Sequence, residues 1–594
     1  MKTKSLATTI AEQCTPNVSA ATSHPINGLC GSRLHPRHKV ARKGSALAPE
    51  ARITPSIGIY GKSSSRRKRI LIVNCYFDDD RRKAQHFTRK LPKPMGPIYL
   101  AGAFAADLCE ARVYCEMFSG PLEDPSLLER LDMLVMTGLT TSFDRMLHLT
   151  AYARTLNNRV IVVAGGPAIR ALPRYSQLFF DYACTGDIEQ LCEVIREAWG
   201  PSYVAGEMSP RFDLAYWIDR VGEMESSRNC NFKCSFCTLT GEGGGYQKYS
   251  LDTIRRDILA MGKRPFLFFI DNNFYGNDRA FFLERIDLLR ELRQRGQFRN
   301  WGALVTNDFF LQSKNLTFAR ESGCTALFSG VESFDPAWLK QMNKLQNART
   351  PQIDTIRACL EAGIVFLYGV MLDVTTRSVA DLRIELDFIT GSSEITLPGY
   401  LSLPVPFPGT PYFHECLTKD LFLPRISLRD LDSTTLVLKP RDSFEEVCQF
   451  LDDIRTMRGF RRRILRQSFS FAKRYRCVLT PEQMIIALSG TALLSLNATV
   501  TTDSLWRSFF RRVPRRTYIG TTEPLDATYR PAFPVASRYA HFFNPTMLTD
   551  ERGRLREELA EDLQEHGLAP GAASSLVSLS TGTRREAMAN QPPD

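Results

Sequence analysis

Three cysteines in the middle of the chain stand at a spacing that suits a metal cluster. Residues 225–237 read ESSRNCNFKCSFC, which sets Cys230, Cys234 and Cys237 in the pattern C-x₃-C-x₂-C. Cysteine thiolates are the usual ligands of iron–sulfur clusters. Three thiolates leave one iron of a [4Fe–4S] cubane without a protein ligand, and that iron can bind the amino and carboxylate groups of S-adenosylmethionine (SAM). The spacing therefore predicts an open cluster.

Two other interpretations of these cysteines are weaker. A structural zinc site takes four ligands, and no fourth cysteine or histidine lies nearby in the sequence. Cysteines packed in a helical core would not stand among polar neighbours, which here are Asn229, Asn231, Lys233 and Ser235. The cluster remains the favoured interpretation.

Most of the fifteen cysteines stand singly in apolar stretches instead, for example Cys109, Cys115, Cys184, Cys324 and Cys359. Free cysteine packs as a small hydrophobic residue. The N-terminal residues lack the continuous apolar core of a secretory signal. These features predict a cytoplasmic protein with reduced thiols.

The cysteine pattern, with aromatic Phe236 directly before the last cysteine, resembles the radical SAM superfamily over about residues 224–411. The resemblance implies an enzyme that cleaves SAM reductively at a [4Fe–4S] cluster and starts radical chemistry on carbon. It also implies that Phe236 packs near the adenine of SAM. No catalytic side chain is assigned beyond the cluster.

Later segments resemble the strand ends of that superfamily in the right order. Residues 269–274 (FIDNNF) depart from the commoner Gly-Gly-Glu form, residues 328–333 read FSGVES, and residues 404–411 read PVPFPGTP. Each segment alone could be an ordinary turn between a strand and a loop. The residues that the resemblance assigns to SAM are Phe236, Asp271, Asn272, Asn273, Asn307, Glu332 and Ser333.

The region before the cysteines alternates strand and helix. Buried-strand runs are expected at residues 70–74, 131–137, 160–164 and 179–184, and helices at 97–109 and 188–199. This alternation predicts a parallel sheet covered on both faces, of the doubly wound flavodoxin or Rossmann-like kind. Such a domain binds its ligand beyond the carboxyl ends of the strands.

Three loops of this region resemble the cobalamin-binding domain that precedes the radical domain in one branch of the superfamily. They read TGLTTS at 137–142, AGGP at 164–167 and TGDIE at 185–189. The D-x-H-x-x-G motif that brings a histidine to cobalt is missing between residues 69 and 200, where the only histidines are His86 and His148. The alternative is a doubly wound domain that binds nothing or a different nucleotide. The residues assigned to cobalamin are Pro97, Thr140, Ser142, Gly165, Gly166 and Gly186.

A second α/β unit is expected after the cysteines, as a full or partial barrel followed by a mostly helical region. Its strands are predicted at residues 266–270, 302–305, 326–329, 365–370 and 400–404, with a helix at 278–295. The expected organisation is a disordered basic leader (1–68), a cobalamin-binding domain (69–200), a linker (201–220), a radical SAM core (221–411), a helical C-terminal domain (412–565) and a disordered tail (566–594).

The net charge of +12 does not predict nucleic-acid binding, because residues 1–68 alone carry a net +10. The apolar run 484–496 is shorter than the roughly 20 residues of a membrane span. A basic run comprises Arg455, Arg458, Arg461, Arg462, Arg463 and Arg466. It is either a solvated helix face or a site for an anionic substrate, a carrier protein or a membrane surface.

Together the two resemblances imply a cobalamin-dependent radical SAM enzyme that methylates an unactivated carbon of a secondary metabolite or lipid. A radical cyclase, oxidase or rearrangement enzyme on the same scaffold is the alternative. A tRNA methylthiotransferase would need cluster cysteines in the N-terminal domain, and a cobalamin sensor has no use for a SAM-binding cluster. The expected partners are a small-molecule, lipid or peptide substrate and an electron donor such as flavodoxin or ferredoxin.

Overall fold

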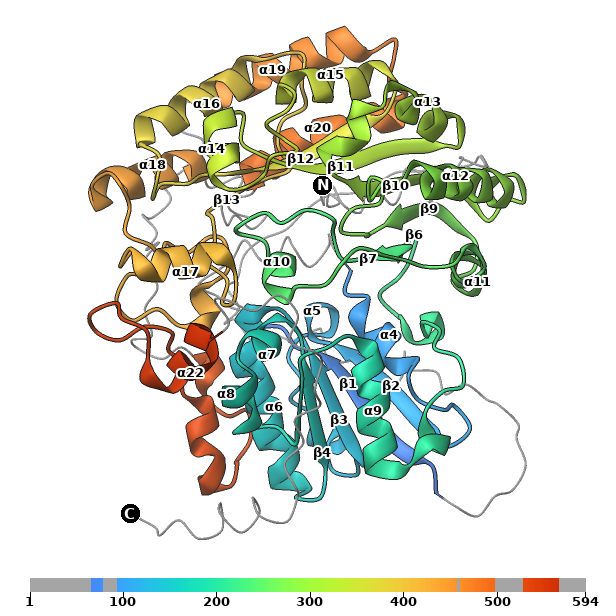
Figure 1. Cartoon of the computed structure of the whole chain (residues 1–594), viewed down its shortest axis with the longest axis vertical. Coiled ribbons are helices and arrows are strands. Elements are labelled where there is room, and N and C mark those ends of the chain that lie inside the picture. Colours follow the sequence, from blue (N-terminus) through green and yellow to red (C-terminus); the bar gives the residue numbers. More distant parts are fainter. Residues whose placement is uncertain (1–65, 78–92, 457–459, 497–526, 566–594) are drawn as a thin grey trace, which may run out of the picture.

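Two sheets, each built of parallel strands, dominate the computed structural model and lie one above the other in Figure 1. The structure describes residues 66–77, 93–456, 460–496 and 527–565. Nearly all of the expected leader and the whole expected tail lie outside these described residues. Among the described residues, no helix is long and apolar enough to cross a bilayer.

The N-terminal sheet has five parallel strands in the order β2-β1-β3-β4-β5. Its strand residues alternate between two apolar clusters. Leu71 and Val73 pack on the side of helix α6 (Phe143–Leu156), whereas Ile70 and Ile72 pack on the side of helices α4 (Gly96–Ala101) and α9 (Ile188–Trp199). The predicted doubly wound fold is confirmed, with the flavodoxin-like strand order. The strands are β1 (Lys68–Asn74), β2 (Cys109–Cys115), β3 (Met133–Thr137), β4 (Ile161–Gly165) and β5 (Tyr182–Cys184).

The predicted helix at residues 97–109 is wrong in its second half. Helix α4 ends at Ala101, and Cys109 opens the edge strand β2. A Cβ at Gly102 would lie 2.2 Å from the carbonyl oxygen of Ser209, so the backbone of residues 201–220 packs directly on the helix end. This tertiary contact is not visible in the local sequence pattern.

The second sheet has six parallel strands in the order β13-β12-β11-β10-β9-β6, so each strand after β9 pairs with the one before it. The sheet does not close, which makes it a half-barrel and confirms the partial-barrel expectation. Its strands are β6 (Val221–Met224), β9 (Arg264–Phe269), β10 (Phe298–Val305), β11 (Cys324–Glu332), β12 (Val365–Met371) and β13 (Tyr400–Ser402). The helices between them are α10 (Thr238–Glu242), α11 (Leu251–Ala260), α12 (Arg279–Gln294), α13 (Ser313–Glu321), α14 (Pro336–Gln341), α15 (Gln352–Glu361) and α16 (Val379–Gly391).

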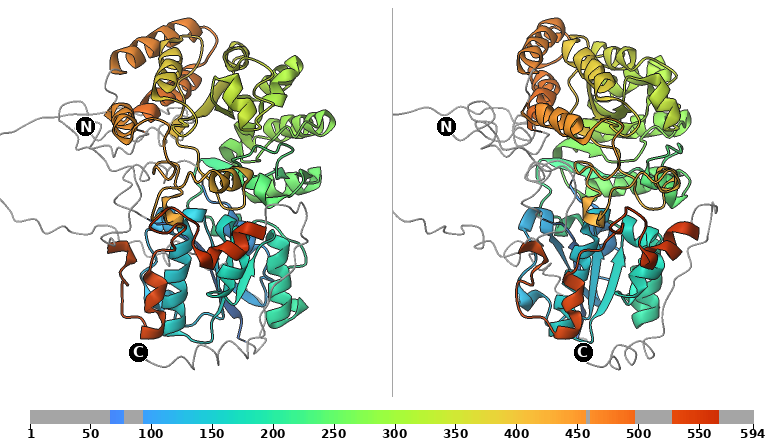
Figure 2. Two further views of the ribbon diagram at one scale, coloured as in Figure 1. Left: turned by 60° about the vertical axis from the view of Figure 1, so that its left-hand side comes forward. Right: turned by 90° about the vertical axis from the view of Figure 1, so that its left-hand side faces the viewer.

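The region 412–565 contacts both sheets. Helices α18 (Phe444–Thr456), α19 (Arg461–Tyr475) and α20 (Pro481–Leu496) pack beside the half-barrel, where Gln483 donates to the carbonyl oxygen of Gly363 at 2.7 Å. Residues 527–565 instead lie along the N-terminal domain, as the red segments of Figure 2 show. Here the Tyr529 hydroxyl donates to Asp144 at 2.8 Å. The chain thus returns to its first domain.

Candidate active site

The cysteine loop lies between the two sheets, after strand β7 (Ser227–Arg228) and before helix α10 (Thr238–Glu242). Cys234 is buried, and Cys230 and Cys237 are half-buried. The Cys237 amide donates to the Cys234 carbonyl at 3.2 Å, and the Thr240 hydroxyl donates to the same oxygen at 2.8 Å. These two bonds fold the loop into a tight turn.

The three thiols are near enough to perturb one another. Burial raises the pKa of Cys230 to about 11, and the thiols of Cys237 and Cys234 contribute in the same direction. Among the described residues, no three His, Cys, Asp or Glu side chains surround a position for a single metal ion. Thiolates are the usual ligands of iron–sulfur clusters. Three of them on one loop are a donor set that fits a [4Fe–4S] cluster with one open iron.

Asp271, the first of the predicted SAM residues after β9, is committed to protein contacts. Asp271 is buried and accepts from the Ser226 amide at 3.0 Å and from its hydroxyl at 2.7 Å. Arg285 lies 3.8 Å from the same carboxylate. Asp271 therefore fixes the segment that leads into the cysteine loop, while exposed Asn272 beside it lines a cavity described below.

Two of the predicted asparagines bond to other side chains near the strand ends, and one of them reaches the cysteine loop. Asn273 donates to Asn231 at 2.7 Å, directly after Cys230. Asn307 accepts from Ser329 at 3.0 Å and donates to Gln352 at 2.8 Å. Asn273 thus holds the cysteine loop, whereas Asn307 joins the end of β10 to β11 and α15.

Glu332 is the last residue of β11 and Ser333 follows it, and the two side chains have different partners. Glu332 adopts a positive φ of 64° and accepts from Lys344 at 2.9 Å. Its second carboxylate oxygen is buried with no hydrogen-bond partner among the described residues, so it can still accept from a ligand.

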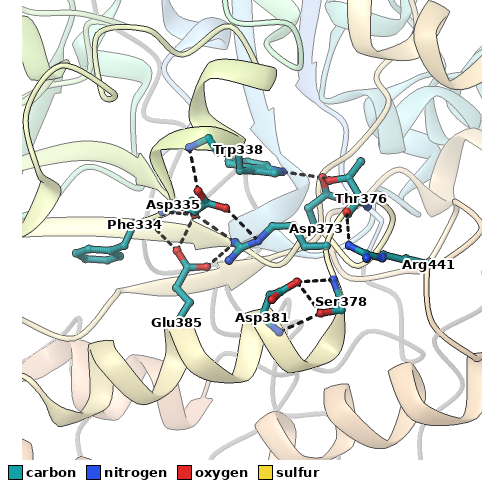
Figure 3. A network of polar contacts seen from close by, with 12 residues as sticks. Phe334, Asp335, Trp338, Asp373, Thr376, Ser378, Asp381, Glu385 and Arg441 are labelled. Carbon is teal, nitrogen blue, oxygen red and sulfur yellow. Dashed lines mark hydrogen bonds and ion pairs between the residues drawn. The ribbon is translucent and has the colours of Figure 1, made fainter.

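Ser333, which the resemblance also assigns to SAM, makes contacts within the protein. Its hydroxyl donates to Glu385 of α16 at 2.6 Å, and Arg377 lies 2.6 Å from the other oxygen of that carboxylate. Figure 3 shows Glu385 below the backbone of Phe334. The Glu385 carboxylate accepts a hydrogen bond from the Phe334 amide at 2.5 Å. Ser333 therefore anchors the strand end to α16.

A polar segment that follows α14 covers the cysteine loop, and the sequence analysis did not identify it. Asn343 donates to the Lys233 carbonyl at 2.6 Å, and Gln346 donates to the Cys234 sulfur at 3.5 Å. The Lys344 ammonium lies 5.5 Å from the ring centre of Phe236. The available signal was the polar run NKLQN at 343–347 after a short helix.

A cavity of about 320 Å³ lies between the N-terminal sheet and the cysteine loop. Three of the residues predicted for cobalamin line it, namely Gly165, Gly166 and Gly186. Pro97, Thr140 and Ser142 are buried and are not among its lining residues, although Gly96, Tyr99 and Thr137 are. His86 lies outside the described residues, and His148 is buried on α6 against Phe543.

The cavity has the position and surface expected for a large ligand. It opens beyond the carboxyl ends of β3, β4 and β5, where doubly wound domains bind. Three glycines present bare backbone there, and Gly166 adopts a φ of 119° that side chains rarely tolerate. The residues present therefore fit a flat cofactor that approaches the backbone closely.

Two reciprocal ion pairs join the domains at the rim of this cavity. Arg170 of the N-terminal domain lies 2.5 Å from Glu242 of α10, and Arg228 of β7 lies 2.9 Å from Glu189 of α9. Burial raises the pKa of Glu225, a lining residue, to about 7, while Arg228 opposes the shift. These charged residues belong to no motif that the sequence analysis used.

A comparison with known protein families finds a match that covers the cysteine loop and most of the half-barrel. Residues 224–383 match the model of the radical SAM superfamily.

Two curated relatives are similar to part of the chain. The hopanoid C-2 methylase of Rhodopseudomonas palustris is 25% identical over 253 residues, which cover 39% of this chain and 48% of the relative. The bacteriochlorophyllide d C-12(1)-methyltransferase of Chlorobaculum tepidum is 29% identical over 197 residues, which cover 32% and 41%. The chain thus spans less than half the length of either relative.

A solved structure of the cobalamin-dependent S-adenosylmethionine radical enzyme OxsB with aqua-cobalamin bound is also similar. It aligns with a TM-score of 0.48 at 13% identity, over 78% of this chain and 83% of that one.

Proposed function

Because residues 224–383 belong to the radical SAM superfamily, we propose that the protein is a cobalamin-dependent radical SAM methyltransferase. In this proposal Cys230, Cys234 and Cys237 hold a [4Fe–4S] cluster that leaves one iron for SAM. Cobalamin occupies the cavity at the strand ends of the N-terminal sheet. The product is the substrate with a new methyl group on a carbon that was unactivated.

One observation carries the proposal: a single cavity is lined by both domains. Gly165 and Gly166 contribute from the N-terminal sheet, and Asn229 and Leu239 contribute from either end of the cysteine loop. Asn229 directly precedes Cys230, and Leu239 lies two residues after Cys237. A ligand held by the glycines would therefore lie in the same cavity as the residues that flank the cluster cysteines.

The protein's own residues would bind and orient the cofactors. When bound, the cluster supplies the electron that cleaves SAM, and cobalamin supplies the methyl group. Gly165, Gly166 and Gly186 let the backbone approach a broad ring. Glu332 offers a free acceptor oxygen near the cluster, and Asn273 holds Asn231 in the cysteine loop.

The relatives support methyl transfer to carbon as the reaction. Both are named as enzymes that methylate a specified carbon position, one of a hopanoid and one of a bacteriochlorophyllide. We extend to this chain a substrate of the same broad kind, a lipid or polycyclic secondary metabolite. A flavodoxin or ferredoxin would supply the electron.

The test is anaerobic reconstitution with iron, sulfide, cobalamin and a reductant, followed by incubation with SAM labelled in its methyl group. Candidate lipids and metabolites are then analysed by mass spectrometry. Label in the product supports methyl transfer. A changed product without label, accompanied by 5′-deoxyadenosine, would instead assign the cyclase, oxidase or rearrangement class. No SAM cleavage with a full complement of iron would contradict the proposal.

A further inference from the structure

Helix α19 has an inner face that fixes it to the half-barrel. Ile464, Gln467, Phe471 and Tyr475 are all buried. Gln467 donates to the Ile395 carbonyl at 2.8 Å, and the Tyr475 hydroxyl donates to a nearby carbonyl at 2.8 Å. The orientation of α19 is therefore set by apolar packing and two side-chain hydrogen bonds.

The opposite side, which we call the outer face of α19, carries large apolar side chains in solvent. Leu465 is 62% exposed and Phe469 is 74% exposed. Exposed Arg462, Arg466 and Lys473 flank them. At about 100° of rotation per residue, all five side chains fall within an arc of about 100°.

This face is unlike an ordinary solvated helix surface. Such a surface carries polar or charged residues of both signs, whereas residues 461–475 (RRRILRQSFSFAKRY) contain no acidic residue. The side chain of Arg461, like those of Arg455 and Arg458, lies outside the described residues.

Two acidic neighbours of α19 are already paired with cations. Asp387 of α16 forms an ion pair with Arg463, and Glu394 lies 3.0 Å from Arg474 and 3.1 Å from Arg357. These carboxylates therefore do not cancel the charge of the outer face.

A further large apolar side chain is exposed on a neighbouring helix. Ile384 on the neighbouring helix α16 is 69% exposed, and the Asp387–Arg463 ion pair joins the two helices. Both helices lie at the end of the molecule opposite the N-terminal sheet (Figure 1). No membrane-spanning helix is needed for a surface of this kind to meet a bilayer.

We propose that the outer face of α19 docks the protein on an anionic lipid membrane. Arginine and lysine would contact the headgroups, and Leu465 and Phe469 would enter the boundary between the headgroups and the acyl chains. The argument is one of complementarity, because a basic face interleaved with exposed apolar side chains matches an anionic interface that is apolar underneath. Nucleic acid would leave Leu465 without an apolar partner.

The test is sedimentation of the full-length protein with vesicles of phosphatidylglycerol and phosphatidylcholine, and with phosphatidylcholine alone. We expect binding to the anionic vesicles, weakened by salt. Each basic residue at such a surface contributes about fivefold in affinity, so R462Q/R466Q should weaken binding by roughly 25-fold. L465S/F469S should also release the protein.

A matched control replaces exposed residues elsewhere. L259S/R295Q removes a half-exposed leucine on α11 and an exposed arginine after α12, and it should bind vesicles within about twofold of the parent protein. All variants change solvent-exposed side chains, and a thermal melt checks their folding. The proposal is overturned if the protein does not bind anionic vesicles, or if both double variants still bind them as the parent does. A preference for a single-stranded oligonucleotide over vesicles would also overturn it.

Discussion

Lys344 donates a 2.9 Å hydrogen bond to Glu332, and both residues are almost completely buried under the cysteine loop, at 7% and 6% exposure. Burial alone would lower the pKa of Lys344, but the Glu332 carboxylate and the Cys234 thiol raise it. The lysine comes from the segment after α14 and the glutamate from the end of β11. The pair thus joins two parts of the half-barrel beside the cluster cysteines.

Removal of one partner of this pair should destabilise the protein strongly. K344M leaves the Glu332 carboxylate buried without a cation, and loss of one member of a buried pair costs about 3–5 kcal/mol. We expect a clear fall in the melting temperature of the apoprotein, measured anaerobically. The double variant K344M/E332Q should regain most of the loss, because no uncompensated charge remains. If the double variant is as unstable as K344M, the pair does not have this role.

Cys234→Ala should abolish cluster binding and SAM cleavage while cobalamin binding persists. Cys234 is the buried member of the three, whereas the lining glycines of the cavity belong to the other domain. Iron content and 5′-deoxyadenosine report the first two effects, and the absorbance of bound cobalamin reports the third. Cys477→Ala, at an exposed cysteine, is the control and should match the parent protein. Continued 5′-deoxyadenosine formation by the Cys234 variant would refute the assignment.

The two sheets could be predicted from the sequence, because parallel strands that are buried on both faces appear as continuous apolar runs. The runs at 70–74 and 365–370 correspond to β1 and β12. Strand β2, which reads CEARVYC, lies at the sheet edge and alternates polar and apolar residues. Local pattern therefore could not separate it from the end of α4.

The candidate site was predictable only where residues stand in short motifs. The three cysteines could be identified from their spacing, and the strand-end glycines from loops that resemble a cobalamin-binding domain. Lys344 and Gln346 reach the cysteine loop from more than 100 residues away in the chain, and Arg170 meets Glu242 across the domain boundary. Such contacts depend on how the two sheets are placed, which no local pattern encodes.

Gly166→Ala should impair cobalamin binding more than it impairs folding. A Cβ there would lie 2.6 Å from the Gly138 carbonyl oxygen, and the φ of 119° is strained for alanine. Either effect shifts the backbone that lines the cavity, so we expect a loss of affinity of at least about tenfold, measured by cobalamin titration. Gly120→Ala is the matched control, since Gly120 also has a positive φ but nothing lies within 4 Å of its Cβ position. Equal affinity losses in the two variants would contradict a role for Gly166 in the cavity.

Glu223→Gln should stabilise the protein at alkaline pH and leave it nearly unchanged at acid pH. Glu223 is 5% exposed on β6 and accepts from the Lys93 amide at 3.1 Å. Burial raises its pKa from 4.5 to about 7, although Lys93 opposes the shift. The folded protein therefore keeps a proton that the unfolded chain releases, and the free energy of unfolding falls as the pH rises from 4.5 to 7.

Glutamine cannot ionise, so the variant escapes this loss. The difference in stability should be small near about pH 4 and reach on the order of 3 kcal/mol above about pH 8. Melting temperatures at both pH values measure it, with Glu129→Gln as a control at an exposed position. If Glu223→Gln gives the same change in melting temperature at both pH values, Glu223 does not hold a proton in the folded protein at neutral pH.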